Sequence, residues 1–433
     1  NLHFTGDIHA ITTANNAICA IIDNHIYQGN ELNIDPNNIT FKRCLDLNDR
    51  ALRFIEIGKG SKFDGIPRKD GFNITVASEI MAILCLATDY KDLRNRIDRI
   101  VIGYTYDKKP VTVKDLKVGG CITLLLKDAF KPNLVQTLEG GPVLIHGGPF
   151  ANIAHGCNSI VATKMGMHLS KYVVTEAGFG ADLGAEKFFD IKCRVANIKP
   201  SAVVLVATIR ALKYHGGVTK DNLNEENVEA MLKGTCNLQK HIETIQAFKL
   251  PFVIAINKFP TDSDAEVKAL YDWCLKNNYP IELSSVWENG GNGGIELARH
   301  VLKLVNETND FKQIYDLNDS IETKLNKVAS IVYGAKNVEL SPLAIEQIKT
   351  YKEYGWDKLA ICIAKTPASL SDDPTLFGRP RDFTIHVREI TPSIGAGFLV
   401  AITGKIMTMP GLPKSPAALK IDLDENGNSV GIF

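Results

Sequence analysis

A loop in the middle of the chain combines two histidines, an asparagine and two adjacent glycines. It follows a short apolar run at residues 142–145 and supplies His146, Gly147, Gly148, Asn152 and His155. A buried strand, a glycine-containing loop and a helix start can bring backbone N–H groups together around an anion. The side chains would add donors, so we predict an oxyanion or phosphate site. The alternative is a connection whose glycines only permit a tight turn.

A second candidate site follows the apolar run at residues 252–256, where Asn257 and Lys258 stand next to each other. This segment resembles the strand and Asn-Lys element of P-loop GTPases, in which that pair frames a nucleobase. In those proteins an Asp two residues after the Lys reads guanine, but Pro260 occupies that position here and Asp262 comes later. We therefore predict a site for an adenine nucleotide or another flat heterocycle.

Two large aromatic residues, Phe259 and Trp287, each come just after a predicted strand. If both strands lie in one parallel sheet, the two rings lie at the same edge and can hold a flat ring between them. Each such contact contributes about 0.5–1.5 kcal/mol beyond the burial of apolar area. The alternative is that each ring packs under its own loop.

Charged residues near two other predicted strands could serve the same site. Arg210 and Lys213 precede Gly216 and Gly217 and could offset phosphate or carboxylate charge, although an exposed pair is the alternative. Glu176 and Asp182 lie where P-loop proteins place carboxylates that bind Mg²⁺ or orient water. Solvated charges at a helix start are the alternative for these two.

These side chains need a scaffold of strands that end at one sheet edge. Apolar runs predict strands at 142–145, 172–175, 202–207, 252–256 and 281–286, and helices at 10–25, 157–170 (N-cap Asn158 or Ser159), 227–248, 264–277 and up to 305. The alternation of strand, loop and helix predicts an α/β fold, a P-loop NTPase-like doubly wound parallel sheet with its sites at the carboxyl ends of the strands.

Two other parts of the chain have a different pattern. Between 39 and 138 we expect helices at 46–54 and 77–86 and strands at 100–106 and 122–126, after a loop at 28–38. Beyond 310 we expect helices at 321–329 and 343–353 and strands at 383–390 and 397–403. The predicted domains are a catalytic core (1–38 and 139–310), an inserted α+β subdomain (39–138) and a C-terminal α+β domain (311–433).

Composition limits the class of protein. Of 433 residues, 45% are hydrophobic, and 49 basic side chains balance 49 acidic ones, which argues against a broad nucleic-acid surface. No apolar run reaches the length of a membrane span. The nine cysteines show no CxxC pairing and are typical of reduced thiols in a cytoplasmic protein. We predict no protein-bound metal site.

Several long motifs in order resemble formate–tetrahydrofolate ligases. The most specific is Val206-Ala-Thr-Ile-Arg-Ala-Leu-Lys-Tyr-His-Gly-Gly217. Similar motifs occupy residues 3–7, 29–33, 146–156, 175–184, 369–374 and 407–413. The resemblance runs over the whole chain.

The resemblance implies a reaction in which ATP phosphorylates formate and N10 of tetrahydrofolate attacks the resulting formyl phosphate. The products are 10-formyltetrahydrofolate, ADP and phosphate. It also implies that Phe259 and Trp287 stack on the pterin, that Leu283 lines that pocket and that Phe179 lies near the folate entrance. We place Arg210 and the loop of His146, Asn152 and His155 near formyl phosphate, and Asn257, Lys258, Gly147 and Gly148 near the nucleotide.

The implied small-molecule substrates are formate, ATP with Mg²⁺, and tetrahydrofolate, in a homo-oligomer, commonly a homotetramer. A requirement for a monovalent cation is left open. One departure is that the family's P-loop, Gly-x-x-x-x-Gly-Lys-Ser/Thr, does not occur in this sequence. We therefore expect a preceding segment to carry it. The alternative is a non-catalytic relative that binds folate or only oligomerises.

Overall fold

The computed structural model describes residues 5–432. They form two compact units, one of residues 5–81, Ile97–Phe130 and residues 407–432, and the other of Ala82–Arg96 and Lys131–Ile406. The chain passes between the units within α2 (Glu79–Leu86) and α3 (Tyr90–Asp98). His3 and Phe4 of the first motif lie outside the described residues. The units group the chain differently from the predicted domains, because 311–406 lies with 139–310.

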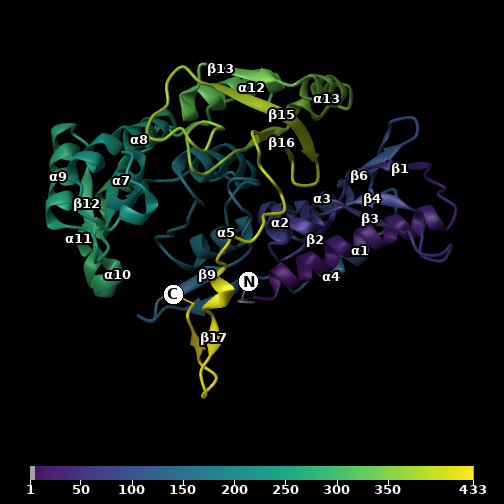
Figure 1. Ribbon diagram of the computed structural model, residues 1–433, viewed down its shortest axis with the longest axis horizontal. Coiled ribbons are helices and arrows are strands. Elements are labelled where there is room, and N and C mark those ends of the chain that lie inside the picture. Colours follow the sequence, from purple (N-terminus) through teal and green to yellow (C-terminus); the bar gives the residue numbers. More distant parts are fainter. Residues whose placement is uncertain (1–4, 433) are drawn as a thin grey trace. The chain divides into compact units, whose positions relative to one another are not determined.

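The first unit is built around the long helix α1 (Asp7–Tyr27), whose buried face includes Ile11, Ile18 and Ile22 (Figure 1). Its strands form one three-stranded antiparallel sheet, β1 (Ile34–Ile39), β6 (Val101–Thr105) and β7 (Pro110–Thr112), and three pairs: β2 (Arg43–Leu45) with β5 (Phe72–Ile74), β3 (Ile55–Ile57) with β4 (Arg68–Asp70), and β17 (Asp422–Leu423) with β18 (Ser429–Val430). A short helix, α4 (Gly119–Leu125), contacts α1.

Three predictions in this region are wrong. Residues 28–38 are not all loop, because β1 pairs with β6 there. Residues 122–126 are helical and not a strand, which shows that a short apolar run is ambiguous without its tertiary partner. Only Arg50–Arg53 form a helical turn within 46–54.

The second unit contains a three-stranded parallel sheet of β10 (Val203–Ala207), β11 (Phe252–Asn257) and β12 (Ile281–Ser284), in that order. Leu205, Ile254 and Ile281 are aligned across it and belong to a core shared with α8 (Val228–Ala247) and α9 (Asp264–Lys276). The other face meets α11 (Ile295–Leu304), where His300 Nδ1 lies 2.9 Å from Glu282 Oε1 of β12. Helices therefore cover both faces, as an α/β sheet requires.

Two segments that we predicted as strands of this sheet do not belong to it. Residues 142–145 do form β9 (Pro142–Ile145), but β9 pairs antiparallel with β8 (Asn133–Gln136) in a hairpin, and its residues are half-buried or exposed. Residues 172–175 form no strand, and Val174 is 91% exposed. The parallel sheet of the described residues is thus smaller than predicted, and a P-loop NTPase-like arrangement is not established by it.

A second sheet in the same unit follows the order β13 (Asn337–Leu340), β15 (Thr384–Ser393), β16 (Phe398–Thr403) and β14 (Ala360–Ala364), with a core completed by α12 (Ile321–Val328) and α13 (Pro342–Glu353) (Figure 1). This mixed sheet confirms the helices and strands predicted beyond residue 310. Smaller helices are α5 (Ile160–Leu169), α6 (Cys193–Ala196), α7 (Ile209–His215) and α10 (Val286–Asn289). Between α5 and α6, Ala181–Ala185 and Phe188–Lys192 are π-helical.

Candidate functional site

The three parallel strands end at one edge, as the sequence predicts. Ala207 is aligned with Ile256, and Asn257 with Ser284, so the loops that follow all begin at the carboxyl edge of the sheet. Arg210, Phe259 and Trp287 lie within three residues of these strand ends. Trp287 is 65% exposed and Leu283, near the end of β12, is 39% exposed. Such exposure of apolar side chains at a sheet edge is characteristic of a binding site.

The loop that carries Phe259 is held by its own neighbours. The Phe259 N–H donates to Asp262 Oδ2 at 2.8 Å, and the Asp262 N–H donates to the Phe259 carbonyl at 2.9 Å. Ser263 then caps α9 in a reciprocal box with Glu266, at 3.2 and 3.1 Å. Phe259 is half-buried on this short, closed loop.

Lys213 connects this loop to the helix that carries Arg210. Its ammonium lies 2.9 Å from Glu266 Oε1, which also accepts the Asn227 N–H at 2.8 Å, and both ionic side chains are fully buried. Burial raises the pKa of Glu266, but its hydrogen bonds from Asn227, Lys213 and Ser263 outweigh that and lower it overall. The prediction that Lys213 could offset the charge of a bound anion is therefore wrong, because its ammonium is occupied by Glu266. Arg210 on the same helix is exposed.

Asn257 and Lys258 follow the central strand directly. Asn257 is the last residue of β11, and the Lys258 N–H donates to the Ser284 carbonyl at 3.0 Å, which extends the pairing with β12. The Lys258 ammonium lies 2.9 Å from Asp264 Oδ1 at the exposed start of α9. The Lys258 side chain is thus partly committed to Asp264 in this structure.

Phe179 lies on a separate turn in the same unit and is 57% exposed. Its φ of 61° is in the left-handed region, which is strained for an aromatic residue. The Gly178 N–H donates to the Gly156 carbonyl at 3.0 Å, and Asp182 at the start of the next helical turn pairs with Lys365 at 2.8 Å. No local pattern in the sequence marked Lys365, because it follows β14, far along the chain.

The histidine loop has a different structure from the one predicted. His146 is 1% exposed, and its Nδ1 lies 2.6 Å from the Oγ of Ser159, the N-cap of α5. His155 is fully buried against Phe398, and burial together with the charges of Lys192, Lys187 and Arg96 lowers its pKa to about 3. His155 is therefore a neutral, enclosed ring and not a donor at an open concavity.

The remaining residues of this loop are less enclosed or differently constrained. Asn152 Oδ1 is buried with no hydrogen-bond partner in the described part of the chain. Gly147 has a φ of 70°, a left-handed backbone conformation that favours glycine at this position. We expected this loop to follow a strand of the parallel sheet. It follows β9 instead, which lies in a hairpin with β8, so the loop is not at the edge of the parallel sheet.

One contact connects the hairpin with the segment after Trp287. Glu139, in the turn between β8 and β9, accepts the Gly291 N–H at 2.6 Å. The glycine-rich segment Gly290–Gly294, which directly follows α10 and its Trp287, is thereby bonded to the hairpin. No pattern in the sequence indicated this contact, which is made four residues after Trp287 in the chain.

Glu176 and Asp182, considered from the sequence as carboxylates that could bind Mg²⁺ or orient water, do not form a cation site in this structure. Asp182 is neutralised by Lys365, and Glu176 belongs to no group of three His, Cys, Asp or Glu side chains suited to a metal among residues 5–432. The described residues offer no cluster of three such side chains, and we derive no chemical step through the ion.

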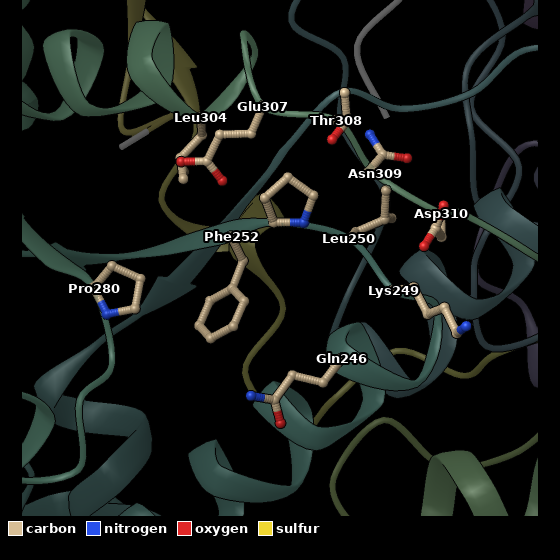
Figure 2. A pocket seen from close by; sticks show the side chains of 11 residues that line it. Gln246, Lys249, Leu250, Phe252, Pro280, Leu304, Glu307, Thr308, Asn309 and Asp310 are labelled. Atoms are coloured by element: carbon tan, nitrogen blue, oxygen red, sulfur yellow. The ribbon is translucent and has the colours of Figure 1, made fainter.

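The amino edge of the parallel sheet has a cavity of about 510 Å³. Figure 2 shows it lined by Gln246, Lys249, Leu250, Phe252, Pro280, Leu304, Glu307, Thr308, Asn309 and Asp310, with Pro251 as the remaining residue. These residues precede or begin β11, precede β12, or end or follow α11. The cavity is therefore at the opposite edge of the sheet from Phe259 and Trp287. It contains none of the predicted site residues, and we do not assign it to the reaction.

Comparison with models of protein families identifies one match, described as formate–tetrahydrofolate ligase, over residues 1–433. The match covers the whole chain, including the strands and loops of the carboxyl edge. Within the part of the chain that the structure describes, no helix has the length and apolar character needed to cross a membrane.

Proposed function

The chain belongs to the formate–tetrahydrofolate ligase family, and from this premise we propose that it joins formate to tetrahydrofolate with ATP by way of formyl phosphate. A formate oxygen attacks the γ-phosphorus of ATP, and ADP leaves. N10 of tetrahydrofolate then attacks the formyl carbon, the bond from that carbon to the phosphate oxygen breaks, and N10 loses its proton as phosphate leaves, which gives 10-formyltetrahydrofolate. The observation that carries the proposal is the placement of Phe259 and Trp287 after adjacent parallel strands of a chain that this family model matches from end to end.

The folate site is the apolar part of the proposal. Trp287 and Phe259 take the two faces of the pterin, Leu283 closes its side and Phe179 contacts the molecule near the entrance. The exposure of Trp287, Leu283 and Phe179 supports this, because a bound folate would remove three apolar side chains from water. Stacking holds a flat ring in place without requiring a charge.

The charged part of the reaction falls to Arg210. Its guanidinium is exposed at the start of α7 and can offset negative charge on formyl phosphate with paired hydrogen bonds. His146, Asn152 and His155 are enclosed to different degrees, so their role is to shape the loop. Asn257, Lys258, Gly147 and Gly148 are proposed to contact the nucleotide, in a P-loop NTPase-like arrangement. Homo-oligomer formation and a monovalent cation also remain predictions.

The alternative, a folate-binding relative without catalysis, has no support from the family match. The two differ in one measurement, ATP-dependent formation of 10-formyltetrahydrofolate. Folate binding without any product formation by the intact protein would favour the alternative.

The folate site is tested by Trp287→Ala in the full chain. Loss of one stacking face should weaken tetrahydrofolate binding by about 1–3 kcal/mol in a calorimetric titration. The matched control is Trp273→Ala, because Trp273 lies on α9 and packs against Tyr279 at a centroid distance of 5.7 Å. Unchanged affinity in the Trp287 variant would remove the aromatic pair from the proposal.

A further inference from the structure

The turn at Phe179 combines strain with exposure. Phe179 has φ of 61° and is 57% exposed, although neither the conformation nor the exposure is favourable for a phenylalanine. A strained residue keeps its conformation only when the surrounding structure determines it strongly. The contacts that hold this turn therefore decide where the Phe179 ring points.

Glycines on both sides bring the turn close to its supports. A Cβ at Gly180 would lie 2.5 Å from Asp182 Oδ1 and 3.4 Å from His241 Cε1 of α8. The Asp182 carboxylate is thus packed directly against the residue that follows Phe179. The Gly180 carbonyl accepts the N–H groups of Leu183 and Gly184, both at 3.0 Å, which begins the helical segment.

Lys365 holds the Asp182 carboxylate from the opposite side. Its ammonium is fully buried and lies 2.8 Å from Asp182 Oδ2 and 3.0 Å from the Thr366 carbonyl, and it also donates to the Ser369 carbonyl. These three acceptors use all three N–H donors of an ammonium group. Lys365 has no proton left for a ligand, so any role in the reaction must act through Asp182.

Asp182 stays ionised in this pair. Burial raises its pKa, but Lys365 and His241 lower it more, so the pKa lies below its usual value. Lys365 is fully buried and the Asp182 side chain is 8% exposed, so the pair is almost entirely removed from solvent. A buried ion pair contributes little net stability compared with apolar side chains of the same size, and it is often retained for the geometry that it imposes.

We propose that Lys365 is a positioning residue for tetrahydrofolate, which holds Phe179 in its binding conformation by fixing Asp182. This inference rests on the proposed function, in which Phe179 contacts folate. It also gives a role to the segment at 369–374, since the Ser369 carbonyl is one of the three acceptors that orient the Lys365 ammonium. Lys365 and Ser369 come from the region after β14, outside the catalytic core predicted from the sequence.

The test uses the full chain with both charges removed, Lys365→Met and Asp182→Asn together, so that no unpaired charge is left buried. The KM for tetrahydrofolate should rise roughly 10-fold, the scale of one lost aromatic contact. The KM values for ATP and formate and kcat at saturating folate should change less than about 2-fold, because Phe179 contacts only folate. A purely structural role would lower the amount of folded enzyme and leave each KM unchanged.

A double-mutant cycle with Phe179→Ala separates the inference from the proposed function. With Phe179 already removed, the charge removal should have no further effect on the KM for tetrahydrofolate. Phe63→Ala is the matched control background, since Phe63 is 76% exposed in the other compact unit and the effect should persist there. Unchanged folate affinity in Phe179→Ala alone would overturn the proposed folate contact.

If Phe179→Ala weakens folate binding but the charge removal does not, or if the two effects multiply, the positioning inference is overturned and the proposed function stands. Should the charge-removal variant fail to fold, Gly180→Ala makes the same test. Its new Cβ would displace the Asp182 carboxylate, so the same selective rise in the KM for folate is expected. An unchanged KM in that folded variant would contradict the inference equally.

Discussion

The loop after β11 and the turn at Phe179 both present an aromatic ring, but they are held in opposite ways. Asp262, Ser263 and Glu266 hold the Phe259 loop, and all three lie within seven residues of Phe259. The Phe179 turn depends on Gly156 and on Lys365, which come from distant parts of the chain. The hydrogen bonds that close the first loop are thus local, although Glu266 also pairs with Lys213 behind it, whereas the second turn is held by distant segments.

The two regions also differ in strain. Phe179 has a left-handed backbone, whereas Phe259 is not among the residues with positive φ. A strained turn held by distant contacts can be displaced by a change far from it, whereas the Phe259 loop has local hydrogen bonds of its own and meets a distant segment at Glu266, which pairs with Lys213. We therefore expect substitutions to separate the two regions clearly.

The largest effect is expected from Lys213→Met, which removes one partner of the buried pair behind the Phe259 loop. Glu266 would be left with a buried, uncompensated charge, which costs about 3–5 kcal/mol of unfolding free energy. Urea denaturation of the full chain measures this loss.

The control for that prediction removes both charges. Lys213→Met with Glu266→Leu should recover most of the stability, because apolar side chains of similar size can replace a buried ion pair. No recovery would mean that the Asn227 and Ser263 hydrogen bonds to Glu266, and not the ionic pair, hold the loop.

The next effect is a pH dependence of the unfolding free energy, caused by His155, which precedes the Gly156 that supports the Phe179 turn. His155 has a pKa of about 3 when folded and an ordinary value near 6.5 when unfolded, so below pH 6.5 the unfolded chain binds a proton that the folded chain does not. Its contribution to stability is complete above pH 6.5 and is lost on acidification, at about 1.4 kcal/mol per pH unit below about pH 6.

His155→Phe should remove that part of the acid loss. Thermal unfolding of the variant and the parent between pH 4.5 and 7.5 measures the difference, as ~1.4 kcal/mol per pH unit corresponds to one proton. Parallel acid limbs for the two proteins would show that His155 is accessible to protons in the folded state.

A smaller effect is expected from Asp262→Ala, which removes the acceptor of the Phe259 N–H. The loss resembles that of a helix cap, about 1–2 kcal/mol. Combined with the Lys365→Met and Asp182→Asn changes, it should be additive within about 0.5 kcal/mol, because the two regions share no hydrogen-bond partner. Strong non-additivity in unfolding measurements would contradict the independence of the two regions.

The smallest effect compares glycine and alanine at the two aromatic positions. At Phe179 the glycine variant should be more stable than the alanine variant by about 1 kcal/mol, because only glycine adopts a left-handed backbone without strain. At Phe259 alanine should be the more stable of the two. The same order at both positions would mean that the strain at Phe179 is not significant.

The local features of the site could be predicted from short segments of the sequence. Apolar runs located β10, β11 and β12, helical patterns located α8 and α9, and the parallel alternation placed Arg210, Phe259 and Trp287 at one edge. These predictions succeeded because hydrophobic periodicity and strand direction are properties of short segments. The family itself was also recognisable from the motifs, and the match over residues 1–433 confirms it.

The buried charges and the pairing of some strands could not be predicted in this way, because both depend on the complete fold. Residues 142–145 have the same apolar character as a central strand, yet they form β9, which pairs in a hairpin with the antiparallel strand β8 and not with the parallel sheet. Lys213, Asp182 and Lys365 look like ordinary charged residues in the sequence, but each is buried against a partner on another segment. A charge can be buried only where a partner compensates it, and that partner is known only when the chain has folded.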